Sequence, residues 1–457
     1  MSAGPAGYTG GTVAGPQPSL AMVTDLYQLT MAAGYMADGL DRRPATFSLI
    51  VRRLPPSRGF LVAAGLNDAL NALESLSFTD DDLRLLEETG LFGPEFLDRL
   101  AGIRFTGSVR AMPEGRLVST GEPLLEVDAP LLEGQLVETT LLSHVGYQTT
   151  VATKAVRLRQ AAGGRPLADF GLRAAPGPEA GMRLARCARL AGLTSTSNVA
   201  GSALYGLPPS GTMAHSFVQA HGDEAAAFES FGRLYGGAST LLVDTYDART
   251  GIDRAVEAAR AMAGRGATPA AVRIDSGDLA ELSRLARRRL DEAGLAAVRV
   301  IATGGLDEHA IAALLEGGAP IDGFGVGSSL AVPRDAPALE TAYKLVEVDG
   351  RPVRKTSEGK VTWPGRKQVW RLPGGRGDVL GLAGEEPPEP GAVPLMIGVM
   401  EAGRRLEVDA CDLAAGAARV DADLGEMGPA QLRLDTPDPL PVTVSVGLRA
   451  LTEGMSR

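Results

Sequence analysis

Between residues 167 and 326 the chain repeats one pattern of apolar and polar positions. Short apolar runs end in polar residues or glycine, and each is followed by a segment with helical spacing of its apolar positions. The runs are Leu167–Phe170, Thr240–Asp244, Ala271–Asp275, Val298–Ala302 and Gly323–Val326. Strands that alternate with helices predict βα units and a parallel sheet. The number of units favours a closed or nearly closed barrel. No G-x-G-x-x-G sequence follows a strand, so dinucleotide binding is not supported.

The regions on either side of this repeat have a different pattern. Residues 20 to 130 mix turns with short strand signals, at Ala45–Val51, Gly107–Met112 and Leu124–Val127. A helical pattern without proline runs from Gln135 to Ala162 and ends at Gly163-Gly164. After Tyr343 the chain returns to strands, turns and proline-rich loops. We therefore expect the C-terminal part to pack with the N-terminal part beside the barrel.

These patterns predict an α/β fold, with an irregular TIM-like α/β barrel flanked by an α+β domain built from the N- and C-terminal segments. Residues 1–19, rich in Gly, Ala and Pro, are expected to form a disordered tail. The expected divisions are then an N-terminal α+β segment over 20–135, the barrel with the active site over 136–345, and the C-terminal segment over 346–457.

Composition narrows the classes of function. The 457 residues carry a formal net charge of −10, which argues against a general nucleic-acid or membrane-surface binder. The two cysteines, Cys187 and Cys411, offer neither a zinc spacing nor a disulfide framework. No run of about 18 apolar residues predicts a membrane span, and the start of the chain does not read as a secretory signal. These features favour a reduced, cytoplasmic protein with no nucleic-acid or membrane partner.

Candidate chemistry lies where the predicted strands end, because active sites of βα barrels occupy the C-terminal ends of the strands. Alternation along Ala271–Asp275 puts Val272 and Ile274 on one face and Arg273 and Asp275 on the other. The outer face of a barrel strand meets apolar helices, so the two charged residues point inward or to the rim and need partners. They form either a structural ion pair or a cation that grips an anionic substrate.

Two glycine-rich turns follow the last two predicted strands, Thr303-Gly304-Gly305 and Gly325-Val326-Gly327-Ser328-Ser329. Glycine lets backbone N–H groups approach an anion closely, and Asp307 can cap the helix that follows the first turn. The final loops of such barrels are a frequent phosphate site. Glycine-rich turns are common, so the prediction of phosphate binding rests on two of them in consecutive units.

His215 lies in Gly211–Phe217 between the hydroxyl residues Thr212 and Ser216. The four histidines show no helical metal-site spacing. Because a single histidine is more often structural than catalytic, position alone leaves both roles open for His215.

Taken together, ordered motifs resemble those of the nicotinate phosphoribosyltransferases, which are type II phosphoribosyltransferases. They run along most of the chain: Thr24–Met31, Asp169–Arg173, Thr196–Val199, Gly211–Phe217, Asp244–Tyr246, Val272–Asp278, Gly304–Glu308, Gly325–Ser329, Tyr343–Leu345 and Gly365–Val369. So many motifs in one order are far more specific than any one of them.

The resemblance implies a reaction in which nicotinate attacks C1 of 5-phosphoribosyl 1-pyrophosphate (PRPP), giving nicotinate mononucleotide and pyrophosphate. It implies coupling to ATP through a phosphohistidine at His215, Mg²⁺ as cofactor, and a homodimer. Matching positions imply roles for further residues. Tyr27, Phe170, Thr212 and Arg273 would bind nicotinate. Arg173, Ser216, Thr303, Gly304, Gly305, Gly325, Gly327 and Ser328 would bind PRPP and its phosphates. Asp275 would be catalytic, and Asp275 or Asp278 would hold the metal.

One position departs from the family pattern, in which two arginines commonly follow Gly-Leu. Here Arg173 is followed by Ala174, so one phosphate-facing cation is absent. A lost bond to a charged group costs about 1.5–3 kcal/mol. Two alternative activities are those of a quinolinate and of a nicotinamide phosphoribosyltransferase. A third alternative is that the protein is a non-catalytic nucleotide-binding homologue.

Overall fold

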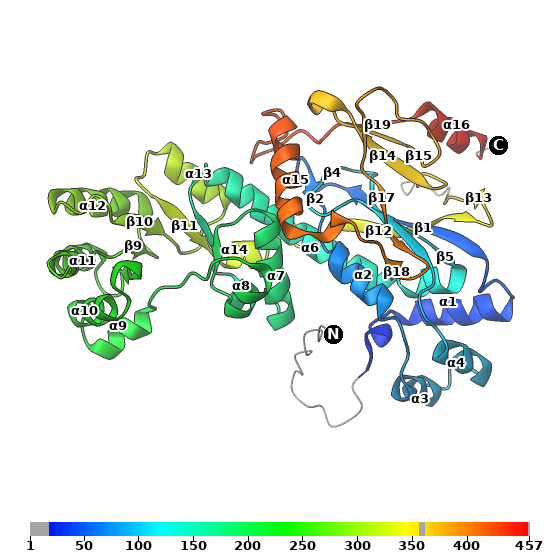
Figure 1. The fold of residues 1–457 in the computed structure, drawn as a ribbon, viewed down its shortest axis with the longest axis horizontal. Coiled ribbons are helices and arrows are strands. Elements are labelled where there is room, and N and C mark those ends of the chain that lie inside the picture. The colour runs from blue at the N-terminus through cyan, green and yellow to red at the C-terminus, as the bar shows by residue number, and fades with distance from the viewer. Residues whose placement is uncertain (1–17, 356–361, 456–457) are drawn as a thin grey trace.

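A computed structural model of the chain describes residues 18–355 and 362–455. The tail expected over residues 1–19 lies outside these residues except for Pro18 and Ser19. Figure 1 shows a helix-covered parallel sheet at one end of the molecule and mixed sheets with their helices at the other. No helix of the described residues is long and apolar enough to cross a membrane.

Strands from both ends of the chain share one seven-stranded sheet. Its order is β13 (Arg351–Pro352), β12 (Glu340–Val348), β1 (Pro44–Arg53), β5 (Pro123–Pro130), β3 (Ser108–Ala111), β17 (Ile397–Glu401) and β18 (Arg404–Arg405). β1 pairs antiparallel with both neighbours, so that Ala45 faces Ala129 on β5 and Val348 on β12. Because β1 is buried along most of its length, it forms the centre of this region's core.

Helices and two smaller sheets complete this region. The helices are η1 (Leu20–Met22), α1 (Leu26–Ala37), α2 (Leu66–Glu74), α3 (Asp80–Glu88), α4 (Pro94–Ala101), α5 (Leu131–Leu136), η4 (Pro373–Gly375), η5 (Asp409–Cys411), α15 (Leu413–Glu426) and α16 (Val446–Gly454). The smaller sheets contain β2 (Leu61–Val62) with β4 (Leu117–Val118), and β16 (Val393–Pro394), β14 (Lys367–Arg371), β15 (Asp378–Leu382) and β19 (Val442–Val444). The long helix α6 (Glu138–Ala161) leads to the parallel sheet and matches the helix predicted from the proline-free run.

The parallel sheet has six strands in the order β7 (Ser195–Thr196), β6 (Leu167–Asp169), β11 (Gly323–Val326), β10 (Arg299–Ala302), β9 (Ala271–Ile274) and β8 (Thr240–Leu242). Its helices are η2 (Leu172–Ala174), α7 (Pro178–Leu190), α8 (Val199–Tyr205), α9 (His215–His221), α10 (Glu224–Tyr235), η3 (Gly236–Ala238), α11 (Ala248–Ala263), α12 (Leu279–Glu292), α13 (Glu308–Glu316) and α14 (Ser328–Ala331). The parallel βα units predicted from the sequence are confirmed.

The prediction of a TIM-like barrel is not confirmed, because the sheet is an open, curled half-barrel. Its edge strands β7 and β8 pair with no common neighbour among the described residues. Between them the chain forms α8, α9 and α10 and passes through Pro208-Pro209, which cannot donate to a central strand ladder. A closed barrel of this type needs eight strands. The gap is therefore lined by an irregular segment rather than closed by strands.

Three helices of the half-barrel begin directly after the loops that carry the candidate chemistry. The side chains of Asp247, Asp278 and Asp307 cap α11, α12 and α13 by accepting hydrogen bonds from backbone N–H groups at 2.8, 2.9 and 2.8 Å. Such caps satisfy donors that a helix leaves unpaired at its start. The cap predicted at Asp307 is confirmed, and the three caps hold the loops at the C-terminal ends of β8, β9 and β10.

Candidate active site

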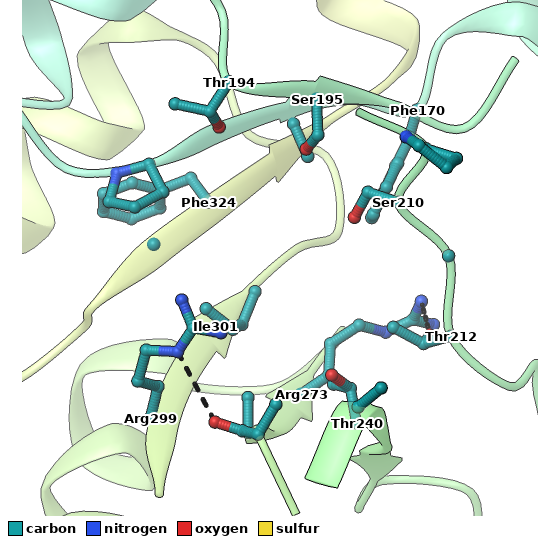
Figure 2. A pocket seen from close by; sticks show the side chains of 18 of the residues that line it. Phe170, Thr194, Ser195, Ser210, Thr212, Thr240, Arg273, Arg299, Ile301 and Phe324 are labelled. Atoms are coloured by element: carbon teal, nitrogen blue, oxygen red, sulfur yellow. Dashed lines mark hydrogen bonds between the residues drawn. The ribbon is translucent and has the colours of Figure 1, made fainter. Parts of the chain in front are cut away.

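A cavity of about 620 Å³ lies along the inner, concave face of the half-barrel. Arg273 on β9 pairs in register with Ile301 on β10, and both line the cavity, as strand alternation requires. Figure 2 shows Phe170, Thr212 and Arg273 around this space, from the end of β6, the loop before α9, and β9. The inward direction predicted for Arg273 is thus the one the structure has.

Arg273 places a cationic guanidinium in the cavity, and not all of its N–H donors have hydrogen-bond partners among the described residues. Its Nη1 donates to Thr212 Oγ1 at 2.6 Å, while its Nε is buried and has no hydrogen-bond partner among the described residues. Burial lowers the pKa of Arg273 and Arg173 adds to this, while Asp275 and Asp244 oppose it. A guanidinium remains protonated at neutral pH. No ion pair joins Arg273 to Asp275 within the described chain, so the structure does not contain the structural pair considered as an alternative.

Phe170 supplies an aromatic side chain to the same cavity as Arg273. Its ring lies against Gly325 on β11, where an added Cβ would stand 2.6 Å from the ring. Gly325 therefore serves ring packing, because any larger residue there would displace Phe170. A cavity lined by an aromatic ring and a half-buried guanidinium is suited to a flat ring that carries an anionic group.

Asp275 and His215 face one another at the C-terminal edge of the half-barrel. His215, the first residue of α9, places Nε2 3.7 Å from Asp275 Oδ2 and Nδ1 3.1 Å from Thr245 Oγ1. The other oxygen of Asp275 accepts a short hydrogen bond from Thr303. Because the imidazole side chain is 41% exposed, a ligand can reach it.

Asp244 supports the Asp275 loop from the neighbouring strand. Its Oδ2 accepts hydrogen bonds from the backbone N–H of Asp275 at 3.1 Å and from Ser276 Oγ at 2.5 Å. Its other oxygen is buried and lacks a partner among the described residues. Asp244 and Thr245 were not among the predicted site residues. The signal that could have found them is their position directly after an apolar strand.

The two glycine-rich turns form the third part of the site. Gly304 has a φ of +90°, and a Cβ there would lie 1.8 Å from the carbonyl oxygen of Asp275, so only glycine fits. Gly327 lies close to the backbone of Phe170: a Cβ added at Gly327 would stand 3.2 Å from the carbonyl oxygen of Phe170. The turns themselves are joined by a hydrogen bond from the Ser329 hydroxyl to the Leu306 carbonyl. Ser328 starts α14, directly after the second turn.

A buried pair behind the site orders the loop that holds Phe170 and Arg173. Thr196 donates to Asp169 Oδ2 at 2.7 Å, and the N–H of Gly171 donates to Oδ1 at 2.8 Å. Burial raises the pKa of Asp169, and the two hydrogen bonds oppose this. Both residues lie in motifs found in the sequence, Asp169–Arg173 and Thr196–Val199, but neither was given a site role, because a buried aspartate that orders a loop has no distinctive sequence spacing.

Arg173 and Ala174 differ in their surroundings although they share the turn η2. Arg173 is close enough to Arg273 to lower the pKa of that group. Ala174 is half-buried against the apolar cluster between α6, α7 and the sheet. The residue that replaces the second family arginine therefore packs against apolar side chains.

Three predicted residues are used differently or lie elsewhere. Tyr27 is on α1, at the opposite end of the molecule from β9 in Figure 1, and contacts Gln28. Ser216 is exposed on α9. One carboxylate oxygen of Asp278 accepts the hydrogen bond that caps α12. Among residues 18–355 and 362–455, no group of three or more His, Cys, Asp or Glu side chains forms a ready metal site.

Comparison with known proteins places this geometry in a family. Residues 22–146 match the model of the nicotinate phosphoribosyltransferase N-terminal domain, and residues 166–365 match the nicotinate phosphoribosyltransferase family. The nicotinate phosphoribosyltransferase pncB2 of Mycobacterium tuberculosis is 48% identical over 389 residues, which cover 84% of this chain and 83% of that protein. This chain belongs to the nicotinate phosphoribosyltransferase family.

Solved structures agree with the assignment to the nicotinate phosphoribosyltransferases. The crystal structure of human nicotinic acid phosphoribosyltransferase matches with a TM-score of 0.82 and 31% identity, over 95% of this chain and all of that one. A nicotinate-nucleotide pyrophosphorylase from Pyrococcus furiosus matches with a TM-score of 0.74 and 25% identity, over 89% of this chain and 95% of that one. The half-barrel and the mixed sheets thus recur together in these relatives.

Proposed function

We propose that the chain transfers the 5-phosphoribosyl group of PRPP to nicotinate, giving nicotinate mononucleotide and pyrophosphate for NAD biosynthesis. The observation that carries this proposal is Arg273, a half-buried cation whose buried Nε has no partner among the described residues and which lines the half-barrel cavity together with Phe170. Nicotinate is a flat ring with a carboxylate, so it matches both groups. The named relatives support the same reaction.

Arg273 also gives the reason to prefer nicotinate over nicotinamide. A carboxylate would accept a charge-assisted hydrogen bond from the guanidinium, whereas a neutral amide would leave the cation less well satisfied. Sites built around such a bond discriminate strongly against analogues that lack it. Thr212 holds one nitrogen of the guanidinium and so fixes its direction.

The donor phosphates would lie on the two glycine-rich turns, with Thr303, Gly304, Gly305, Gly327 and Ser328 as the nearest groups. Arg173 adds a cation at the same edge of the half-barrel. The bond from C1 to pyrophosphate breaks as the pyridine nitrogen bonds to C1, and the electron pair leaves with pyrophosphate. Positive charge develops at the ribose in this step, so the carboxylate of Asp275 would stabilise it electrostatically.

The carboxylates at this edge fit Mg²⁺, which commonly binds through one or two carboxylates together with substrate phosphates and water. Asp244 has a buried oxygen without a partner, and Asp275 has one oxygen that faces His215. Asp275 would hold the ion with Asp244, while Asp278 serves mainly as a helix cap. When bound, Mg²⁺ would neutralise charge on the pyrophosphate.

For ATP coupling, we propose that His215 Nε2 attacks the γ-phosphorus of ATP and that ADP leaves. Thr245 holds Nδ1, which leaves Nε2 as the nitrogen that faces Asp275 and the phosphate turns. A phosphoryl group on His215 adds close to two negative charges at this edge. That charge can favour one state of the site and so link ATP hydrolysis to product formation.

Tyr27 would enter the site from a second copy of the chain. Leu26, Tyr27 and Met31 on α1 are 53%, 47% and 37% exposed, so α1 carries an uncovered apolar stripe. The stripe includes Tyr27, the residue that the resemblance to the family assigns to nicotinate binding. A homodimer in which α1 reaches the partner's half-barrel would cover the stripe and complete the pocket. Mixing a Tyr27→Ala chain with an Arg273→Ala chain should then restore part of the activity.

The decisive experiment measures pyrophosphate release from PRPP with nicotinate, nicotinamide and quinolinate, each with and without ATP. We expect release with nicotinate alone among the three, increased by ATP. Release with quinolinate would favour the decarboxylating alternative. Binding of PRPP without release from any acceptor would favour a non-catalytic homologue.

A further inference from the structure

A cluster of five charged side chains is buried behind the two phosphate turns, outside the cavity. It joins Glu308 and Asp335 to Arg58, Lys154 and Arg157. Glu308 is the first residue of α13, directly after the turn that ends in Asp307, and its side chain is fully buried. Asp335 follows α14, which starts at the second turn. Each turn is therefore continuous with one carboxylate of the cluster.

Lys154 on α6 bridges the two carboxylates. Its Nζ lies 2.5 Å from Glu308 Oε2 and 2.9 Å from Asp335 Oδ1. Arg157, one helical turn further along α6, lies 3.1 Å from Glu308 Oε1. On the other side, Arg58 from the segment after β1 lies 2.6 Å from Asp335 Oδ2 and 3.8 Å from Glu308 Oε1. α6 and the N-terminal segment thus hold both turns from behind.

Both carboxylates are charged in this setting. Burial raises the pKa of Asp335, but Arg58 and Lys154 outweigh it and lower the value to about 2. Burial opposes ionisation of Glu308 as well, and Lys154 and Arg157 lower its pKa overall. The cluster carries one more positive than negative charge. Its net field is therefore favourable to an anion on the turns in front of it.

We propose that Glu308 and Asp335, bridged by Lys154, are positioning residues for the donor phosphates. They act through the turns 303–307 and 327–329 and do not touch substrate. The Ser329–Leu306 hydrogen bond joins the two turns directly. The ion pairs of the cluster add a second connection, through Glu308 and Asp335, that restricts the movement of one turn relative to the other. This inference rests on the proposed function to the extent that the turns bind the phosphates of PRPP.

The test compares Glu308→Gln with Asp378→Asn, a matched control. Asp378 is another buried carboxylate in an ion pair, 2.8 Å from Arg371, but it lies on β15 in the C-terminal sheet. Calorimetry gives the Kd of PRPP with Mg²⁺ and of nicotinate for each protein, and thermal unfolding gives Tm. We expect Glu308→Gln to raise the Kd and KM of PRPP by about tenfold or more, the factor that a lost charged hydrogen bond produces. The Kd of nicotinate should stay within about twofold, inside the spread expected of a site with no changed partner.

Three further variants, at two positions, keep the test decisive if Glu308→Gln does not fold. Asp335→Asn removes the more exposed carboxylate and should weaken PRPP in the same direction. Lys154→Met should do so too, while Lys154→Arg retains the charge and should recover most of the PRPP affinity. Equal PRPP affinity in these variants and the control, with a similar fall in Tm, would overturn the inference.

Binding separates this inference from the proposed function. If the wild-type protein binds PRPP but forms no nicotinate mononucleotide, the proposed function fails. A selective loss of PRPP affinity in Glu308→Gln would still support the positioning role in that case.

Discussion

The two ends of the active site are built from different parts of the chain. At the end where we propose that the acceptor nicotinate binds, Phe170, Thr212 and Arg273 line the cavity with their side chains. At the end proposed for the donor PRPP, Gly304 and Gly327 let backbone segments approach one another closely, and the charged side chains of the cluster around Glu308 lie behind the turns. In a site formed by side chains, one substitution removes one interacting group. In a site formed by the backbone, a substitution at a glycine adds a side chain where there is no space for one, and so displaces the whole turn. Substitutions at the two ends should therefore fail in different ways.

The largest effect is expected at the donor end, for Gly304→Ala. The new Cβ would stand 1.8 Å from the Asp275 carbonyl oxygen at a φ of +90°, so the turn and Asp275 must both move. We expect turnover to fall below about one thousandth, since misplacement of reacting groups by 1 Å alone can cost a factor of a hundred. Steady-state assays with varied PRPP measure the loss.

Gly305→Ala is the control for that change. Gly305 also has a positive φ, of 64°, but a Cβ there would meet nothing within 4 Å. It should cost about 1 kcal/mol of strain and only a modest part of the activity. Similar losses in both variants would mean that strain, and not the contact with Asp275, limits the turn.

At the acceptor end, Arg273→Ala removes the cation. A lost hydrogen bond to a charged group costs about 1.5–3 kcal/mol, so the KM of nicotinate should rise by up to about a hundredfold. The KM of PRPP should change far less. Equal increases for both substrates would remove the contrast between the two ends.

Between the two ends, His215→Ala separates ATP coupling from transfer. The variant should lose ATP stimulation and the acid-labile phosphoenzyme while slow transfer without ATP continues. Coupling between linked sites is typically about 5- to 150-fold, and the lower part of this range is expected here. Ser216→Ala, at the exposed neighbouring position, should retain stimulation. ATP stimulation of the His215→Ala protein would refute the role.

The smallest effect is expected for Thr212→Val, which removes the hydrogen bond to Arg273 Nη1 but keeps the shape. This bond orients Arg273 and does not touch nicotinate, so only about 1 kcal/mol of its free energy is expected to appear in nicotinate binding, and the KM of nicotinate should rise about fivefold. The nicotinate-to-nicotinamide preference should fall with it. An unchanged preference would show that Arg273 keeps its direction without Thr212.

Local pattern predicted much of the site because the strands are regular. Alternation alone placed Arg273 and Asp275 on the inner face, and the glycine turns were found because two occur in consecutive units. The TIM-like barrel, predicted as closed or nearly closed, is not confirmed, since β7 is only two residues long and the described segment around Pro208 forms no strand. A strand count from apolar runs does not reveal whether the edges of a sheet meet.

Long-range partners were beyond sequence pattern. Lys154 and Glu308 are 154 residues apart, and nothing in either segment marks the other as its ion-pair partner. Tyr27 shows the opposite problem, because its motif implies a place in the pocket while its own chain holds it elsewhere. Both depend on how distant segments pack, which local propensity does not encode.

The pairing of β1 with β12 has a consequence for how the chain folds during synthesis. Ala45 meets Val348, so the seven-stranded sheet cannot complete its centre until the whole half-barrel has been made. The half-barrel strands, in contrast, all lie within residues 167–326 and can pair as one contiguous stretch emerges. Contacts distant in sequence form slowly because a long loop must close first. One edge of the apolar strand β1 therefore stays unpaired until β12 is made, and an unpaired strand edge exposes the growing chain to aggregation during this interval.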